Sequence, residues 1–274
     1  MTKIKYSIPL FCSIDLNISF LKLIKTNPEY FYNNIEINSV YGAPNFCIWS
    51  GGIAPQNLKQ FSKEELEKIF YTLNNEFNIP INLTFTNSLL KNCHYKDRFG
   101  HLCLELASNN LNEITVFNED FMLYLKNKYS NFKYNLSINK LEQIKNNYNK
   151  YILNSSDLSL LKDLKNEEKS KIELLINLSC QKDCLNKEEH LFLNNSSILN
   201  YGKKYLFKNC NKNSIDKITY EDINNNYLPA GFNQFKIDEN INNPIELLLI
   251  YCDYMVKPEY KNSVINIIIK NLKN

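Results

Sequence analysis

Short β-branched or aromatic runs alternate with helix-period segments along nearly the whole chain, and this alternation limits the possible folds more than any other feature. Repeated strand and helix units form a parallel sheet, because each helix returns the chain to the edge at which the next strand starts. The sequence therefore predicts one α/β domain over residues 1–274, a barrel of the TIM type, whose usual length is roughly 250 residues. Eight runs have the length and composition of strands: Tyr6–Ile14, Asn34–Val40, Ile81–Thr86, Glu113–Phe117, Lys133–Ile138, Lys150–Leu153, Glu173–Leu178 and Gly231–Ile237.

Amphipathic segments separate these runs and predict helices. Ser62 and Glu65 have the spacing of a capping box, and Pro244 is suited to the first turn of a helix. Residues 185–227 are polar and aperiodic, so we expect a long excursion over the C-terminal mouth of the barrel. The predicted helices are Ser62–Leu73, Glu119–Lys128, Lys140–Asn149, Asp157–Asn166 and Asn243–Met255.

The composition predicts a cytoplasmic protein without membrane contact. The N-terminus lacks the apolar stretch and small-residue cleavage site of a secretory signal, and the apolar run Leu247–Cys252 is interrupted by Asp253. The formal charge is +3, with basic and acidic residues mixed along the chain, which permits an RNA partner without favouring one. Eight cysteines in a reducing compartment point to metal ligands or core packing rather than to disulfides.

Cys180 and Cys184 are the clearest candidates for metal ligands, because they follow an apolar strand run directly. Two thiolates on a turn that leaves a strand can face one point, and thiolates bind iron–sulfur clusters or zinc. The radical SAM pattern C-x3-C-x2-C is excluded, because Lys187 stands where its third cysteine is required.

Cys210 lies in the polar excursion and is the expected third ligand. For the fourth ligand we favour Cys47, which precedes Trp49 and a pair of glycines that lets the backbone approach a ligand closely; His190 is the alternative. The remaining thiols occupy apolar or helical surroundings and are expected to be buried: Cys12, Cys93, Cys103 and Cys252.

Asparagines stand where several of the predicted strands end. Helix capping and turn formation account for most of them, and Asn87 and Asn177 are the best candidates for substrate contacts. We expect His94 and His101 to lie in a solvated loop, and Glu36 to point into the barrel.

Residues 231–238 read GFNQFKID and precede the helix predicted over Asn243–Met255. This segment resembles the closing segment of the collagenase-like peptidase family, in which a strand reading FKIEGR precedes a helix that carries a tyrosine. The resemblance implies a barrel and a [4Fe-4S] cluster held by one early and three later cysteines, which here are Cys47, Cys180, Cys184 and Cys210. It also implies that Lys236 and Asp238 lie at the mouth, whereas the family's arginine, and with it a contact to an anionic substrate, is absent.

These observations lead to an expected function without an identified catalytic residue. We expect an iron–sulfur-dependent redox modification enzyme, with oxygen-independent hydroxylation-type chemistry on RNA or a small molecule. Its expected partners, besides the substrate, are an electron donor or another protein. The first alternative is a non-catalytic accessory protein stabilised by zinc at Cys180, Cys184, Cys210 and His190. The second is a peptidase-like hydrolase.

Overall fold

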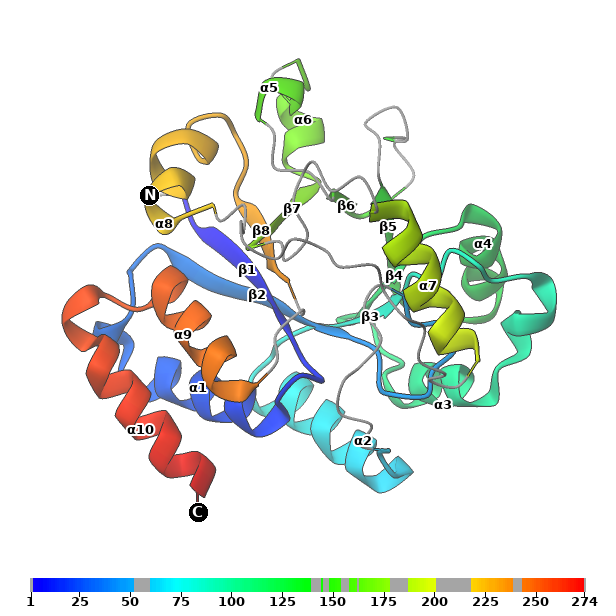
Figure 1. The fold of residues 1–274 in the computed structure, drawn as a ribbon, viewed down its shortest axis with the longest axis horizontal. Coiled ribbons are helices and arrows are strands. Elements are labelled where there is room, and N and C mark those ends of the chain that lie inside the picture. The colour runs from blue at the N-terminus through cyan, green and yellow to red at the C-terminus, as the bar shows by residue number, and fades with distance from the viewer. Residues whose placement is uncertain are drawn as a thin grey trace.

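Eight parallel strands close into a barrel in the part of the chain that the computed structural model describes. Each strand pairs with the next along the chain, and β8 pairs with β1 (Figure 1). This arrangement confirms the predicted single α/β barrel. The described residues are 2–51, 60–138, 144, 148–153, 158–161, 163–177, 187–200, 218–238 and 243–273. The strands are β1 (Ile4–Pro9), β2 (Ile35–Gly42), β3 (Ile81–Phe85), β4 (Glu113–Val116), β5 (Lys133–Ile138), β6 (Tyr151–Leu153), β7 (Ile172–Ile176) and β8 (Gln234–Ile237).

All eight predicted strands are present, and the prediction for the first one ends too late. Strand β1 ends at Pro9, and helix α1 begins at Ile14 after a short turn. The side-chain amide of Asn17 explains this boundary, because Nδ2 donates to the carbonyl of Pro9 at 2.7 Å and to that of Leu10 at 3.2 Å. The carbonyls at the strand end are thereby satisfied without further strand pairing.

Helices surround the barrel, and α1, α9 and α10 form one group on its outside (Figure 1). The predicted capping box starts α2, since Ser62 Oγ accepts from the Glu65 amide at 3.2 Å and Glu65 Oε2 accepts from the Ser62 amide at 2.9 Å. None of the helices that the structure describes has the length and apolar character that a membrane span requires. The main helices are α1 (Ile14–Thr26), α2 (Lys63–Tyr71), α3 (Arg98–Leu106), α4 (Glu119–Lys128), α5 (Leu158–Leu161), α6 (Asn166–Lys169), α7 (Lys187–Leu199), α8 (Tyr220–Asp222), α9 (Pro244–Met255) and α10 (Lys261–Lys273), with a π-helical segment η5 (Ile223–Tyr227) after α8 and a 3-10 segment η3 (Asn92–Lys96) before α3.

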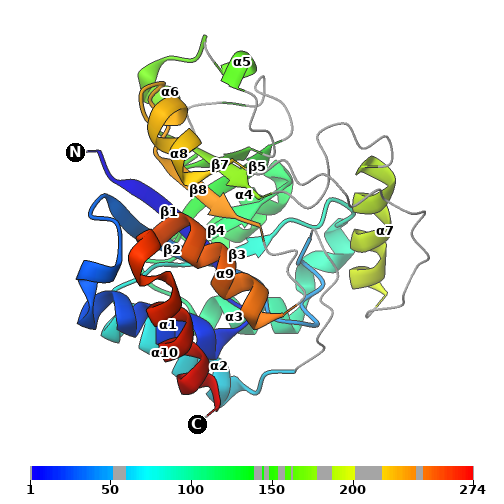
Figure 2. The ribbon, with the colours of Figure 1, turned by 60° about the vertical axis from the view of Figure 1, so that its left-hand side comes forward.

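Two predicted helices and the predicted excursion differ from the structure or lie partly outside the described residues. The segment expected as one helix over Asp157–Asn166 contains α5 and only the start of α6, while most of Lys140–Asn149 lies outside the described residues. The expected excursion over 185–227 contains α7, α8 and η5 in its described part. Helix α7 stands apart from the helices around the barrel, on the side toward which the strands point (Figure 2).

The apolar core lies between the barrel wall and the helices. Alternate residues of β1 illustrate this, since Tyr6 faces outward and its hydroxyl donates to the carbonyl of Tyr254 on α9 at 3.3 Å. Ile4 and Ile8 share that face and are fully buried, whereas Ser7 faces the barrel interior. Because successive side chains of a strand point to opposite faces, the polar positions of this strand are directed into the barrel.

Candidate active site in a polar barrel interior

The interior of the barrel is polar, although TIM-barrel interiors are usually filled by branched apolar side chains. In an eight-stranded barrel the inward side chains form layers of four, each drawn from alternate strands. Tyr41 and Ile152 are buried without joining the apolar cluster outside the wall, as expected for inward positions. The strand registers give a lower layer of Ser39, Glu113, Lys150 and Gln234, a middle layer of Ser7, Asn82, Asn135 and Glu173, and an upper layer of Tyr41, Thr115, Ile152 and Lys236. Two residues beyond the middle-layer positions, Pro9, Thr84, Ser137 and Leu175 lie further toward the C-terminal mouth.

An ion pair between Lys150 and Glu113 occupies the lower layer, with 2.8 Å between Nζ and Oε2. Asn135 Nδ2 donates to the same carboxylate at 2.8 Å and accepts in turn from Asn149 Nδ2 at 3.0 Å. Burial by itself would lower the pKa of Lys150, but attraction to the carboxylates of Glu173 and Glu113 outweighs it and raises the pKa above its ordinary value. Lys150 therefore stays charged at neutral pH.

A second polar cluster joins β7, β1 and β2. The Ser7 hydroxyl donates to Glu173 Oε1 at 2.5 Å, and Ser7 Oγ lies 2.8 Å from Ser39 Oγ. Glu173 is fully buried in the middle layer. This places a carboxylate near the barrel axis, one layer below the mouth-side residues.

Lys236 carries a positive charge in the upper layer. Its ammonium nitrogen lies 3.8 Å from the centre of the Tyr41 ring, and 8% of the residue is exposed. The Tyr41 hydroxyl donates to the carbonyl of Ile237 and so fixes the ring against β8. An aromatic face attracts an ammonium group without neutralising its charge. Lys236 was predicted as a mouth residue, and the structure places it at the mouth end of the interior.

Asn177 and Asp238 meet where β7 and β8 end. Asn177 has a positive φ of 51°, and its Oδ1 accepts from the backbone amide of Asp238 at 3.0 Å. The same amide lies 3.4 Å from the carbonyl of Ile176. The Asn177 side chain thus extends the pairing of the two strands, which gives it a structural role beside Lys236; its predicted substrate contact stays a prediction.

Asn87 joins the segments that follow β2 and β3 to helix α7. Its Nδ2 donates to the carbonyls of Ile48 and Asn195, each at 3.2 Å, and its Oδ1 accepts from the amide of Leu89 at 3.0 Å. The residue is 1% exposed. Its amide therefore serves the backbone of three segments, and a contact with substrate remains untested.

Cys47 is enclosed in the core, with 1% of the residue exposed, and its predicted role as a metal ligand stays a prediction. Burial raises the pKa of its thiol well above the ordinary value, and the nearby Cys103 and Asp97 add to this effect. A ligand to iron or zinc must be a thiolate. Gly51, expected to admit a ligand, instead admits the chain itself, because a Cβ there would lie 2.2 Å from the carbonyl carbon of Thr86.

The other predicted ligands are only partly described. Cys180, Cys184 and Cys210 lie outside the described residues, and His190 is a partly buried residue of α7. Within the described ranges no group of three or more His, Cys, Asp or Glu residues could hold a metal ion. The expectation of buried thiols holds for Cys103 and Cys252 but is wrong for Cys93, which is exposed.

His101 lies in an aromatic cluster, which corrects the expectation of a solvated loop. Its Nδ1 lies 2.8 Å from the hydroxyl of Tyr129, and its Nε2 lies 3.1 Å from the carbonyl of Tyr95. The ring of Trp49 packs edge-on at 5.0 Å between centroids. The expectation for Glu36 is also wrong, because Glu36 is exposed and the inward residues of β2 are Ser39 and Tyr41.

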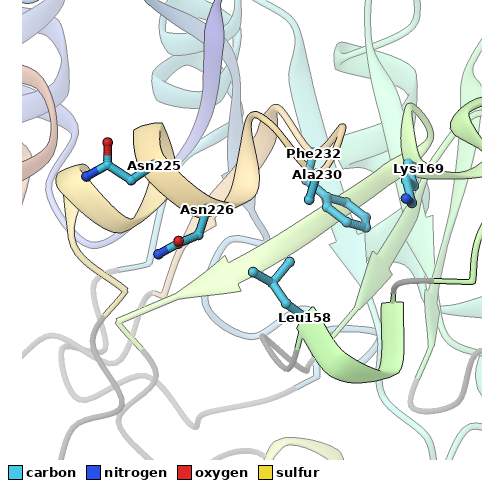
Figure 3. Close-up of a pocket in the computed structure, with 6 residues that line it drawn as sticks. All are labelled: Leu158, Lys169, Asn225, Asn226, Ala230 and Phe232. Carbon is cyan, nitrogen blue, oxygen red and sulfur yellow. The ribbon is translucent and has the colours of Figure 1, made fainter.

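A surface pocket of about 420 Å³ lies outside the barrel (Figure 3). Its lining residues come from α5, α6, η5 and the segment before β8, and Lys169 Nζ lies 5.7 Å from the centre of the Phe232 ring. Lys169 and Phe232 precede β7 and β8, so they lie toward the N-terminal ends of these strands. The pocket is therefore separate from the C-terminal mouth.

Sequence reasoning missed Ser7, Tyr41 and Glu173 as interior residues. A signal was present, because Glu173 is the only charged residue in the otherwise apolar β7, and Lys236 is the only one in β8. A charged residue flanked by apolar neighbours in a buried strand must find a polar environment on one face. In a barrel that environment is the interior.

Comparisons with known proteins indicate no family for this chain. No family model matches the sequence, and no curated protein matches it. Among solved structures, 2-keto 3-deoxygluconate aldolase from Picrophilus torridus matches with 10% sequence identity and a TM-score of 0.36, covering 100% of this chain and 85% of that chain. The resemblance to collagenase-like peptidases therefore stays a prediction.

Proposed function

We propose that this chain is an enzyme that binds a small anionic substrate at the C-terminal mouth of the barrel, with Lys236 as the cation that receives the anionic group. The observation that carries the proposal is the position of the Lys236 ammonium in the upper layer, 3.8 Å above the Tyr41 ring. Active sites of TIM barrels lie at this end. A cation held against a π face keeps its positive charge.

The other cations described in or near the barrel suit this role less well. Lys150 lies two layers below Lys236 and forms its ion pair with Glu113. Lys169 lies outside the barrel, beside Phe232. Lys236 is therefore the interior cation nearest to the mouth among the described residues.

The proposal is tested by calorimetric titration of inorganic phosphate and propionate into the wild-type protein and into Lys236→Met. We expect binding to weaken by about 10-fold or more in Lys236→Met, because a charge-assisted contact is lost. Lys169→Met is a matched control, since it removes another lysine that packs over an aromatic ring, and it should bind like the wild type. Equal binding by Lys236→Met and the wild type would contradict the proposal.

As a second candidate we propose that the reaction is an iron–sulfur-dependent redox modification, of RNA or a small molecule, with Cys180, Cys184 and Cys210 as ligands. Its support is that the segment carrying Cys180 and Cys184 continues from Asn177 at the C-terminal end of β7, and that Leu175 of β7 pairs in register with Lys236. The enclosed thiol of Cys47 leaves the fourth ligand open, with His190 as one choice.

Metal analysis of anaerobically purified protein tests this candidate. Iron and sulfide in equal amounts, lost in Cys180→Ser with Cys184→Ser and retained in Cys47→Ser, would support it. Stoichiometric zinc would instead support the zinc-stabilised accessory protein, with His190 as a ligand. A folded, metal-free protein would contradict both the iron–sulfur enzyme and the zinc-stabilised accessory protein.

A further inference from the structure

We infer that a surface pocket on the C-terminal side of the barrel binds a free amino acid with an aromatic side chain. The pocket has a volume of about 420 Å³ and is lined by Asn92, Tyr95, Lys96, Asp120 and Tyr124. Its lining therefore combines two aromatic rings with one ammonium and one carboxylate group. Small-molecule sites typically have this size, with aromatic walls and a small number of polar groups.

The pocket lies where the segments after β3 and β4 meet. The 3-10 segment η3 follows β3, and the first turn of α4, which contains Asp120, follows β4. Segments that follow the strands of a TIM barrel form the face on which active sites lie. Strand β4 is four strands away from β8 in the closed barrel, so this pocket and Lys236 belong to opposite parts of that face. The two sites can therefore be tested separately.

Two tyrosine rings provide the aromatic part of the pocket. Tyr95 lies on η3 and Tyr124 on α4, and their ring centroids are 5.3 Å apart. Phe121, which is fully buried, contacts Tyr95 at 4.7 Å between centroids and so fixes η3 against α4. The hydroxyl of Tyr124 lies 3.1 Å from Nε2 of His101, which orients the second ring. Because both rings are held in place before a ligand arrives, an aromatic side chain can pack on them without a cost for ordering them.

Lys96 and Asp120 add charges of opposite sign to the same lining. Both residues are exposed, and neither side chain forms an ion pair or a hydrogen bond with the residues that the structure describes. Asp120 lies near the rings, since burial and then the charge of Asp120 raise the pKa of the Tyr95 hydroxyl. An α-ammonium group would donate to Asp120, and an α-carboxylate would accept from Lys96 and from Nδ2 of Asn92.

The two charges favour a zwitterion over a simple acid or amine. A simple acid would bring its carboxylate into a pocket that already contains Asp120, and a simple amine would bring its ammonium beside Lys96. A free amino acid carries both charges on one carbon, next to its side chain, and compensates both groups. The N-terminus of α4 is not the binding group, because Asn118 Oδ1 already accepts from the backbone amides of Asp120 and Phe121.

Calorimetric titration of L-phenylalanine and three analogues tests this site. The analogue 3-phenylpropionate lacks the ammonium, phenethylamine lacks the carboxylate, and alanine lacks the ring. We expect a dissociation constant on the order of 1 mM for phenylalanine. Each analogue should bind more weakly by about 10-fold or more, because a charge-assisted contact or the ring contact is lost. Trp49 fluorescence gives a second readout, since its ring contacts Phe121 at 5.0 Å between centroids.

Two substitutions connect each charge of the ligand to one residue. In Lys96→Met the preference for phenylalanine over phenethylamine should fall to below about 3-fold, and in Asp120→Asn the preference over 3-phenylpropionate should fall likewise. Both residues are exposed, so both variants should fold. Lys126→Met is the matched control, because Lys126 is an exposed lysine of α4 outside the pocket lining, and this variant should bind like the wild type.

The outcomes also separate this site from the anion site at Lys236. Lys236→Met should bind phenylalanine like the wild type. Binding that is lost in Lys236→Met and retained in Lys96→Met would place the amino acid in the mouth and overturn the pocket while supporting the anion site. Equal binding of phenylalanine and phenethylamine would overturn the zwitterion, and no binding of phenylalanine at about 10 mM would overturn the site as a whole.

Discussion

Glu113 and Lys150 form an ion pair of 2.8 Å inside the barrel, with only 6% and 8% of their side chains exposed. Removing one partner of a buried pair leaves an uncompensated charge in a low-dielectric environment. We therefore expect Lys150→Met to lower the free energy of unfolding by about 3–5 kcal/mol, because it leaves the carboxylates of Glu113 and Glu173 without their cation. Urea unfolding measures this change.

A double-mutant cycle shows whether the loss comes from the unpaired charge. Adding Glu113→Gln to Lys150→Met should restore part of the lost stability, since one of the two uncompensated carboxylates disappears. The exposed pair of Lys63 and Glu67, 3.6 Å apart on α2, is the control, and Lys63→Met should change stability by less than about 1 kcal/mol. If the losses of unfolding free energy from Lys150→Met and Glu113→Gln simply add, the two residues do not stabilise each other.

Protonation of His101 should destabilise the protein as the pH falls. Burial lowers the pKa of His101 below its ordinary value of 6.5, and Lys128 lowers it further. The folded state thus favours the neutral ring, so the stabilisation is complete above pH 6.5 and is lost as the pH falls through the lower pKa of the folded state. The Tyr129 hydroxyl can donate to Nδ1 of the neutral ring, whereas the carbonyl of Tyr95 beside Nε2 acts in the opposite direction and raises the pKa, without outweighing burial and Lys128.

The chain's single tryptophan, Trp49, reports this titration, because its ring packs against His101. Its fluorescence should change with a midpoint below pH 6.5, and His101→Phe should abolish the transition. His94→Gln is the control, because Trp49 Nε1 donates to the backbone carbonyl of His94, which this substitution keeps. A transition that persists in His101→Phe would assign it to another group.

The barrel could be predicted from the sequence, because the spacing of apolar residues within each short segment distinguishes a strand from a helix. The capping box at Ser62 and the cap at Asn243 are likewise formed by residues three positions apart. Strand ends are less predictable, as β1 shows, where the end depends on the side chain of Asn17 on the following helix. Helix α7 was missed, since its sequence has no clear apolar face.

The interior site depends on contacts between distant segments and could not be predicted in the same way. Glu173 lies in an apolar run typical of a strand buried on both faces, and only the closure of β8 onto β1 brings Ser7 to its carboxylate. Asn177 and Asn87 were placed correctly at strand ends, but their amides bind the chain itself. Lys236 was identified from a resemblance, whereas its contact with Tyr41 required the register of the barrel.

Gly100 of α3 allows the Trp49 ring to pack directly against the helix. A Cβ at this position would lie 2.3 Å from Cε3 of Trp49, which is fully buried, so the ring would have to move. We expect Gly100→Ala to lower the free energy of unfolding by about 1–3 kcal/mol, despite the better helix propensity of alanine. Glu105→Ala on the exposed side of α3 should stay within about 0.5 kcal/mol of the wild type. Urea unfolding followed by Trp49 fluorescence measures both.

Thiol labelling distinguishes an enclosed Cys47 from one that serves as a metal ligand. Cys47 and Cys103 are buried, and burial raises the pKa of both thiols, that of Cys103 to about 12. Because the thiolate is the reactive form, iodoacetamide at neutral pH should modify the exposed Cys93 in the native protein and leave Cys47 and Cys103 unmodified until the protein is unfolded. Peptide mass spectrometry after labelling, with and without prior treatment with a chelator, locates the modified residues. Labelling of Cys47 that appears only after the chelator, while the far-UV circular dichroism spectrum stays that of the folded protein, would indicate that the thiol is a metal ligand rather than a packed core residue.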